Sequence, residues 1–535
     1  MLNAADEASA TPTIQPGGVP PQLLIVTVDS VQAAITLIAP TEGEARFIAS
    51  RPAVADEPHR GIPGALTRLA AQCGFALTEE MIGATIVAGP PIALRVVGVC
   101  DADDATALAI AEQFGVARII AEPMTPPRNP TRDRSWYRPI TDAWRDGRIE
   151  ALLVVVPPGV LPFWAAQFLT ALGEVTADGQ ARVLLLASDA DLADTVAADA
   201  IFLPRDAHRA SHLTGALNRL RAARLLRGNA ADAPILARTE ALAVAIRAVR
   251  AACGRPCVYL DVADGATVMI ADDNGVNVHH DSEIDYARGA VRLLNRCETA
   301  YISRWVPFAV SASSLRRWAL RRISAPVAML ADEKDRVIAA GFAHAALSMT
   351  LEKIALPIPD GALWVLGPAL ARLVSHAVAL RFVADLMPSV RVAIVTCDDD
   401  DLIPAVGALS VSHPADASSL LAHDALVPTG SVVQAASPGR RARGVMTATL
   451  ASDDRTVTIE VTPDTLMAIP CLGSATFGRT DDASTDDQVS VHGGPGGLLI
   501  NTRRRPLAAL TPHPSRPSVS SRLRPASATN DRSDR

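Results

Sequence analysis

Two stretches of the chain carry an aspartate at the end of an apolar run, directly before a turn. The more complete one is residues 258–275, where a buried strand is expected to lead into Asp261 and a turn that contains Gly265. Small residues let backbone N–H groups approach an anion closely, because no side chain blocks the way. An acid beside such a turn is typical of phosphate-binding sites.

A second copy of this pattern lies near the N-terminus, in residues 23–43. Counted from Asp29 and Asp261, the two stretches align without a gap, so that Ala34 matches Ala266 and Gly43 matches Gly275. Two hairpins in one register predict a duplicated α/β unit. The alternative that stays open is that two apolar hairpins resemble each other by chance.

The composition is that of a globular protein without a basic surface. The chain has 535 residues, 49% of them hydrophobic and 20% charged, and a net charge of −7. This length predicts roughly three domains. The acidic balance offers no electrostatic basis for binding nucleic acid or an anionic membrane, so we expect small metabolites and proteins as partners.

Cysteine usage and the start of the chain both predict a cytoplasmic location. The seven cysteines are scattered, which fits a reducing compartment, and the first twenty residues lack the apolar segment of a secretory signal. Residues 151–173 carry no charge and are long enough to span a bilayer. Pro157-Pro158-Gly159 would break such a helix, so a strand, a turn and a buried helix are expected, with a membrane span as the alternative.

Strand and helix patterns alternate along most of the chain, which predicts a parallel or mixed sheet with helices on its faces. After about residue 430 the pattern changes to short alternating strands, and residues 493–497, Gly-Gly-Pro-Gly-Gly, are expected to form a turn because a strand follows them. The predicted units are a disordered leader, two α/β subdomains, a β-rich module and a disordered tail, at residues 1–21, 22–230, 231–429, 430–510 and 511–535.

Several short motifs follow one another along the chain. They are Asp261-Val262 with Gly265-Ala266-Thr267, Arg288-Gly289-Ala290, Arg304-Trp305-Val306-Pro307, residues 403–409, Gly493-Gly494, and residues 503–507. In this order they resemble the glutamate mutase L family, which belongs to the actin/sugar kinase/Hsp70 superfamily and occurs beside B12-dependent mutases. The resemblance covers roughly residues 23–507.

The resemblance implies an α/β fold with two RNase H-like subdomains, followed here by the small β-rich module. In that superfamily a nucleotide lies between the halves, the two hairpins hold its phosphates and the metal, and a glycine pair carries the adenosine. Carried over to this chain, the nucleotide cleft consists of Asp29, Ser30, Asp261, Gly265, Thr267 and Gly367.

The chain departs from the family pattern at each of these loops. The first loop keeps Asp29 but lacks the glycine and the lysine, and the second has Ala263 and Asp264 at the glycine positions. Asp264 puts a negative charge where a phosphate would lie, and Pro368 after Gly367 removes a backbone donor. Val268 replaces the second acid of the loop. We therefore interpret the cleft as vestigial, with no catalytic residue, no metal ligand and no resident cofactor; Mg-ATP is the alternative.

Three functions remain open. The first is a non-catalytic or weakly nucleotide-binding scaffold or chaperone for a B12-dependent mutase or another protein partner. The second is an active ATP-dependent mutase reactivase, and the third is a structural interaction protein unrelated to B12. Because phosphoryl transfer depends on positioned charges and small residues, their loss favours a protein that is not an enzyme.

Three further features carry side chains that could do chemistry. The acidic run from Asp398 to Asp401 is expected to be solvated, with a bound cation as the alternative. Cys397 beside it is expected to be unreactive, because acidic neighbours raise a thiol pKa. His279 and His280 are adjacent on an extended segment and should point to opposite faces, which predicts no shared metal ion.

Overall fold

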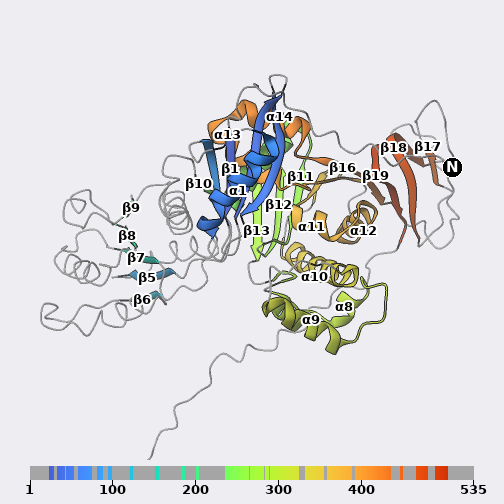
Figure 1. Cartoon of the computed structure of the whole chain (residues 1–535). Coiled ribbons are helices and arrows are strands. Elements are labelled where there is room, and N and C mark those ends of the chain that lie inside the picture. Colours follow the sequence, from blue (N-terminus) through green and yellow to red (C-terminus); the bar gives the residue numbers. More distant parts are fainter. Residues whose placement is uncertain are drawn as a thin grey trace, which may run out of the picture.

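Figure 1 shows the computed structural model of the chain, with its N-terminal strands in blue and its C-terminal strands in red. The structure describes residues 23–28, 33–41, 44–53, 58–74, 77, 81–87, 94–98, 121–123, 151–155, 182–186, 201–203, 235–263, 265–281, 284–287, 289–324, 330, 332–354, 358–387, 392–434, 446–449, 465–479 and 489–503.

The first sheet combines four N-terminal strands with one strand from much later in the chain. Its order is β3-β2-β1-β4-β10. β1 is antiparallel to β2 and parallel to β4, which is in turn parallel to β10. The strands are β1 Leu23–Val28, β2 Ala33–Thr41, β3 Glu44–Ala53, β4 Ile82–Val87 and β10 Ile235–Ala237.

The second sheet is larger and is built from strands that follow β10 in the chain. Its order is β13-β12-β11-β14-β15-β16-β19-β18-β17. The strands are β11 Cys257–Asp261, β12 Ala266–Asp272, β13 Gly275–Asp281, β14 Leu363–Leu366, β15 Val392–Cys397, β16 Val427–Gln434, β17 Met446–Thr449, β18 Leu466–Arg479 and β19 Val489–Asn501.

The first five strands of the second sheet repeat the order of the first sheet. In both, a central strand has an antiparallel hairpin on one side and two parallel strands on the other. β11 thus corresponds to β1, β14 to β4 and β15 to β10. The chain is an α/β protein with two RNase H-like halves, and the predicted fold class is confirmed.

The gap-free match between the two hairpins is nevertheless wrong in register. Val258 pairs with Ile270, but the aligned Val26 pairs with Ile35 instead of Ile38, three residues further on. The first hairpin is therefore shorter between its strands. The order of strands is duplicated, whereas the connecting loop is not.

A third sheet is inserted between β4 and β10. All its neighbouring strands are parallel and their order is β6-β5-β7-β8-β9, which is the flavodoxin-like order of doubly wound folds. The predicted unit 22–230 thus contains strands of two sheets, and β10 from the next unit completes the first; the domain boundaries stay predictions. The strands are β5 Leu94–Gly98, β6 Ala121–Pro123, β7 Ala151–Val155, β8 Arg182–Leu186 and β9 Ile201–Leu203.

The start of the uncharged segment 151–173 is strand β7, and its remainder lies outside the described residues. In the part of the chain that the structure describes, no helix combines the length and the apolar character needed to cross a bilayer.

Two helices form a layer shared by both halves. α6 (Arg238–Cys253) and α13 (Leu402–Ser412) bury their apolar side chains in one cluster, which includes Ile25 of the first sheet and Met269 of the second. α1 (Pro58–Cys73) covers the other face of the first sheet, and α14 (Pro414–His423) packs beside β3.

The remaining helices cover the other face of the second sheet. They share one large apolar cluster with the side chains of β11, β12, β14 and β15. The segment after β14 forms two helices, α11 and α12, because the chain is extended at Val374 and Ser375 between them. The elements are α7 Ala290–Arg296, α8 Thr299–Ser303, α9 Ala312–Ser324, α10 Glu333–Glu352, α11 Pro368–Leu373 and α12 His376–Leu386.

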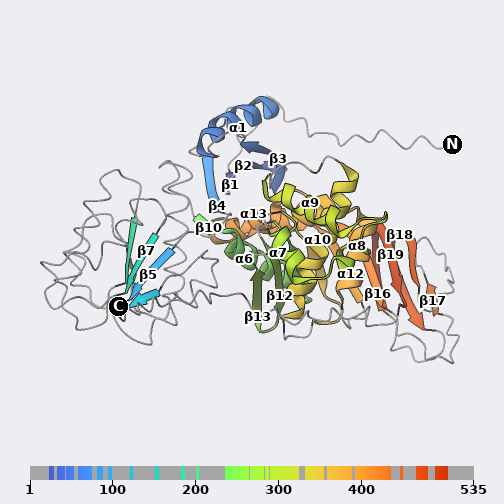
Figure 2. The same ribbon diagram turned by 90° about the horizontal axis from the view of Figure 1, so that it is seen from below.

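The C-terminal strands extend the second sheet instead of forming a sheet of their own. Figures 1 and 2 show β17–β19 at one end of the molecule and the third sheet at the other. The glycine-rich segment lies within β19, so the predicted turn is wrong. A Cβ at Gly493 would lie 2.0 Å from the Cys471 carbonyl oxygen, and one at Gly494 would lie 2.6 Å from that of Thr429. The glycines let neighbouring backbones approach closely.

The crossing of α6 and α13 generates a prediction about stability. A Cβ at Gly407 of α13 would lie 1.8 Å from the carbonyl oxygen of Ala241 in α6. Gly407→Ala must push the two helices apart, and overpacking of this kind costs about 1–3 kcal/mol or more. Urea unfolding measures the loss.

Gly64→Ala in α1 is the matched control, because its Cβ would meet only the end of Arg68 at 3.5 Å and alanine favours a helix by roughly 0.5–1 kcal/mol. Equal effects of the two changes would contradict the close crossing.

Candidate functional site

Three strand ends of the second half meet the beginnings of three helices. β11, β14 and β15 are parallel neighbours that end at Asp261, Leu366 and Cys397. α11 and α13 start just after β14 and β15, and α6 enters from the first half. Ligands of open α/β sheets bind outside the carboxyl ends of the strands. Asp261 therefore lies where the fold places a site.

The Asp261 carboxylate is covered by its neighbours and is only 2% exposed. Gly367 lies directly against it: a Cβ there would stand 2.7 Å from Asp261 Cγ and 2.5 Å from the Tyr259 hydroxyl oxygen. The Tyr259 hydroxyl donates to Asp261 Oδ2 at 3.5 Å. Burial and the charge of Asp261 raise the pKa of Tyr259 well above its usual value, so this hydroxyl keeps its proton.

Arg238, the first residue of α6, is the cation of the site. It is 8% exposed. Its two terminal nitrogens donate to the carboxylate of Asp401 at 2.8 and 2.5 Å, and Nη2 lies 3.6 Å from Asp261 Oδ2. Burial disfavours the charged guanidinium, but the carboxylates of Asp401 and Asp261 outweigh it and hold the pKa of Arg238 well above its usual value. Arg238 thus links an element of the first half to two acids of the second.

Asp401 is held in an uncommon backbone conformation. Its φ of 61° and ψ of 39° are left-handed, and among the described residues it is the one non-glycine with positive φ. Aspartate tolerates this region better than most residues, at a cost of order 1 kcal/mol. Because Asp401 directly precedes α13, this conformation places its carboxylate at the start of the helix, where it meets Arg238.

Asp398 is fully buried and binds the start of α13. Its carboxylate oxygens accept the backbone N–H groups of Leu402 at 2.7 Å and Ile403 at 3.1 Å. Burial, together with the charge of Asp401, raises the pKa of Asp398 well above its usual value. Asp399 and Asp400 are exposed. The prediction of a solvated acidic run is therefore wrong for its two outer members, which serve the helix start and the ion pair.

The predicted cleft residues of the second hairpin are only partly brought together. Thr267 lies opposite Asp261 in the β11–β12 ladder, and its hydroxyl is 2.9 Å from His280 Nδ1. Gly265 has a φ of 122°, a turn conformation that favours glycine. Asp29, Ser30 and Asp264 lie outside the described residues. Of the predicted set, Asp261 and Gly367 are in direct contact, and their role in nucleotide binding stays a prediction.

The histidine pair beside this hairpin has other partners. His280, which contacts the Thr267 hydroxyl, is largely buried. Burial lowers the pKa of His280, so the ring is neutral at pH 7. Burial also lowers the pKa of His279. Asp281 Oδ2 pairs with Lys353 at 2.6 Å and with Arg296 at 3.4 Å. Within the described residues, no group of three or more metal-ligating side chains converges.

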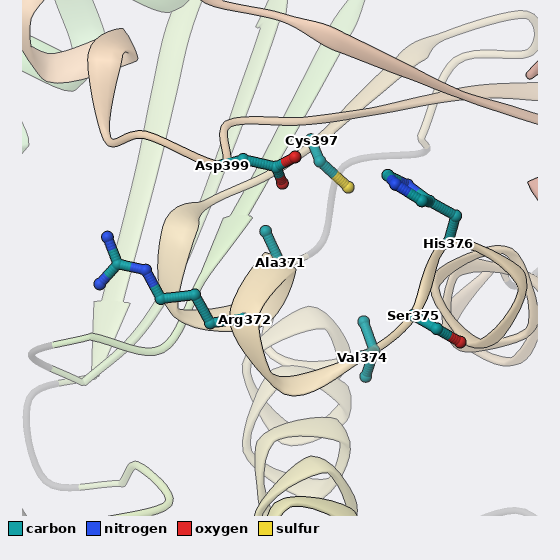
Figure 3. Close-up of a pocket in the computed structure, with 7 residues that line it drawn as sticks. All are labelled: Ala371, Arg372, Val374, Ser375, His376, Cys397 and Asp399. Atoms are coloured by element: carbon teal, nitrogen blue, oxygen red, sulfur yellow. The ribbon is translucent and has the colours of Figure 1, made fainter. Parts of the chain in front are cut away.

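A small cavity lies between the end of α11, the start of α12 and the residues after β15. Its volume is about 170 Å³, and Figure 3 shows its seven lining residues: Ala371, Arg372, Val374, Ser375, His376, Cys397 and Asp399. Thr429 donates to Cys397 Sγ at 3.2 Å. Burial raises the pKa of Cys397 to about 11, so the thiol is protonated at neutral pH and a poor nucleophile. The cavity is smaller than the roughly 300 Å³ at which typical cofactor sites begin.

Comparison with known proteins does not assign the chain to a family. No family model and no curated protein matches it. A solved Ppx/GppA phosphatase from Aquifex aeolicus, a type II variant, is similar at 10% identity over 67% of this chain and 70% of that one, with a TM-score of 0.19. An Aquifex aeolicus member of the Ppx/GppA family is similar at 10% identity over 68% and 69%, with a TM-score of 0.18. Similarities this weak support no conclusion about activity.

Sequence reasoning missed Arg238, although it is central to the site. The residue stands at the start of an amphipathic helix, where an arginine reads as an ordinary surface residue. Its partners Asp261 and Asp401 are 23 and 163 residues away along the chain. The only signal was indirect: a buried strand-end acid needs a cation, and none stands next to it in sequence.

The ion pair predicts a large loss of stability when its cation is removed. Arg238→Met leaves the buried carboxylate of Asp261 and the partly exposed one of Asp401 without this cation. Breaking a fully buried pair costs about 3–5 kcal/mol, which is the upper bound here. Urea unfolding at pH 7 measures it, and Arg238→Met/Asp401→Asn should recover part of the loss. The control is Asp273→Asn, which breaks the exposed pair with Arg250 and should cost below about 1 kcal/mol. A loss for Arg238→Met no larger than this control would contradict the assignment.

Asp398 predicts how stability depends on pH. Because its folded pKa is raised, its contribution is complete below the unfolded value of about 4 and is lost as pH rises through the folded pKa. Asp398→Asn removes this loss and still caps α13. Its stability relative to the parent chain should rise with pH, by at most about 1.4 kcal/mol per unit, in urea unfolding between pH 4 and 8.

The control for this experiment is Asp424→Asn, whose effect on stability should change with pH for the opposite reason: the folded pKa of Asp424 is lowered. Burial of Asp424 is outweighed by its hydrogen bonds with Arg46, which lower the pKa of Asp424. Its contribution is present above the unfolded pKa and is lost as pH falls through the folded one. Asp424→Asn should therefore be less stable at neutral pH, and the difference should shrink in acid. Parallel pH curves for Asp398→Asn and the parent chain would contradict the assignment of Asp398.

Proposed function

We propose that the chain is a non-catalytic, at most weakly nucleotide-binding scaffold of the glutamate mutase L type, which acts on a B12-dependent mutase or a related protein partner. The observation that carries the non-catalytic part is the state of Asp261. This acid is the one that a nucleotide cleft would use, and it is buried beneath Gly367 and beside Arg238.

The described side of the cleft does not fit Mg-ATP. Magnesium keeps several waters and needs a carboxylate that it can reach, whereas Asp261 is closed off from solvent. Arg238 already neutralises part of its charge. The position of the family's second acid holds Val268, which is fully buried in β12. The chain therefore offers no second carboxylate at this position. Phosphoryl transfer relies on positioned cations and backbone donors, and their loss supports a role without catalysis.

The framework around the cleft supports a retained structural role. The segments that carry the family resemblance supply packing: Trp305 lies 4.3 Å from the His344 ring between centroids, and residues 403–409 of α13 are buried between the two sheets. A chain that keeps the residues joining its halves but not its phosphate loops fits a binding protein better than an enzyme.

Titration of the purified chain with Mg-ATP tests the non-catalytic part. We expect no binding at micromolar concentration by isothermal titration calorimetry, and no phosphate release. The reason is that the Asp261 carboxylate lies beside Arg238 and is covered by Gly367. Asp261→Ala should leave both results unchanged, as should the exposed control Asp273→Ala. Micromolar binding with hydrolysis that is lost in Asp261→Ala but kept in Asp273→Ala would overturn this part and favour the reactivase.

Affinity capture of the tagged full chain from its native lysate tests the partner. Mass spectrometry should find a B12-dependent mutase subunit enriched over a capture with an unrelated tagged protein. Reproducible capture without any mutase subunit would overturn the mutase assignment and favour the structural protein unrelated to B12.

A further inference from the structure

Helix α9 lies at the edge of the molecule, beyond α10 and away from both sheets, as Figure 1 shows. Its inner face is firmly seated. Trp318 stacks on Phe342 of α10 with ring centroids 4.9 Å apart, and its Nε1 donates to Asp335 at 2.9 Å. Leu315 and Ala319 are fully buried on the same side. These contacts hold the helix in place, so its outer face has a fixed orientation.

The outer face combines arginines with exposed aliphatic side chains. Leu320 is 53% exposed and Ile323 is 43% exposed, although both are large and apolar. At 100° per residue, Leu320 lies at the middle of this face, between Arg316 and Arg317 one turn before it and Ile323 one turn after it. Phe308, 36% exposed, precedes the helix. Contiguous exposed apolar side chains mark interaction sites.

This face is also positive on an otherwise acidic chain. Of the four arginines of α9, Arg322 is buried, and Arg316, Arg317 and Arg321 are exposed on the outer face. The helix has no acid, while the whole chain has a net charge of −7. Arg321 lies 3.9 Å from Asp335. Among the described residues, no ion pair joins Arg316 or Arg317 to an acid. Both guanidinium groups are exposed to solvent, where an anionic partner can reach them.

We propose that the outer face of α9, made of Arg316, Arg317, Leu320, Arg321 and Ile323, docks an acidic amphipathic segment of a partner protein. Arginine guanidinium groups suit carboxylates, which they bind with paired hydrogen bonds. Leu320 and Ile323 then meet the apolar residues of the segment. This deepens the proposed scaffold role by naming the chemistry of its partner, and it rests on that role.

Other anionic surfaces fit the face less well. A bilayer-bound helix offers a broad apolar face, whereas here the large aromatic Trp318 points inward and only two aliphatic side chains are exposed on α9. A nucleic-acid backbone offers phosphates but no apolar partner for a central leucine. An acidic protein segment satisfies both parts of the surface at once.

A synthetic acidic amphipathic peptide, with Glu at i and i+4 and Leu between, serves as the probe. Fluorescence anisotropy of the labelled peptide with the full chain should show binding that weakens with salt. Arg316→Glu/Arg317→Glu should weaken it by about tenfold or more, and Leu320→Ser by several-fold. Arg247→Glu, an exposed arginine on α6, is the matched control and should leave it unchanged. All four positions are exposed, and unchanged thermal unfolding confirms that the variants are folded.

Three further arms separate the alternatives. The same peptide with Ser in place of Leu should bind more weakly than the original, because it loses the contacts with Leu320 and Ile323. Phosphatidylserine vesicles and duplex DNA should bind no better to the parent chain than to Arg316→Glu/Arg317→Glu.

Absence of peptide binding, or equal loss in Arg247→Glu, would overturn the docking surface. Vesicle or DNA binding that depends on α9 without peptide binding would overturn it too. The ATP titration and the affinity capture do not depend on this surface, so a failure here leaves the scaffold proposal to its own tests.

Discussion

The ion pair between Arg238 and Asp401 sits where the two halves of the protein meet, and the rest of the site depends on it. Arg238 begins α6 at the end of the first sheet, and Asp401 precedes α13 at the end of the second. A buried ion pair contributes little net stability, because desolvation offsets the attraction, yet breaking it is costly. Its main effect is geometric: both helices must start at fixed positions relative to Asp261.

That geometry explains why Asp261 is covered. With α6 and α13 crossing at a glycine, the two sheets approach through a single layer of helices, and the strand ends of the second half are drawn against the start of α6. The contact with Arg238, which links the two halves, therefore also covers Asp261. The side chains that join the halves cannot at the same time leave this carboxylate open to solvent.

Sequence patterns within short segments predicted much of this arrangement. Contacts between segments far apart in the chain could not be predicted from them. The apolar strand that ends at Asp261 and the turn at Gly265 both follow from residue patterns within a short segment. Such patterns could not predict three features: the pairing of β10 with β4, the burial of Asp398 and the position of the glycines inside β19. Each depends on a contact between segments far apart in the chain, which no local window contains. Arg238 was missed for the same reason.

The position of β19 has a consequence for how the chain reaches its final form. β19 lies between β16 and β18, so among the described strands it is the one that joins the hairpin of β17 and β18 to the large sheet. During synthesis that hairpin leaves the ribosome before β19 has been made. Such non-local pairing delays folding, because the loop must close before its contacts form. For that interval β16 presents an unpaired edge, a surface on which newly made chains are prone to associate with one another.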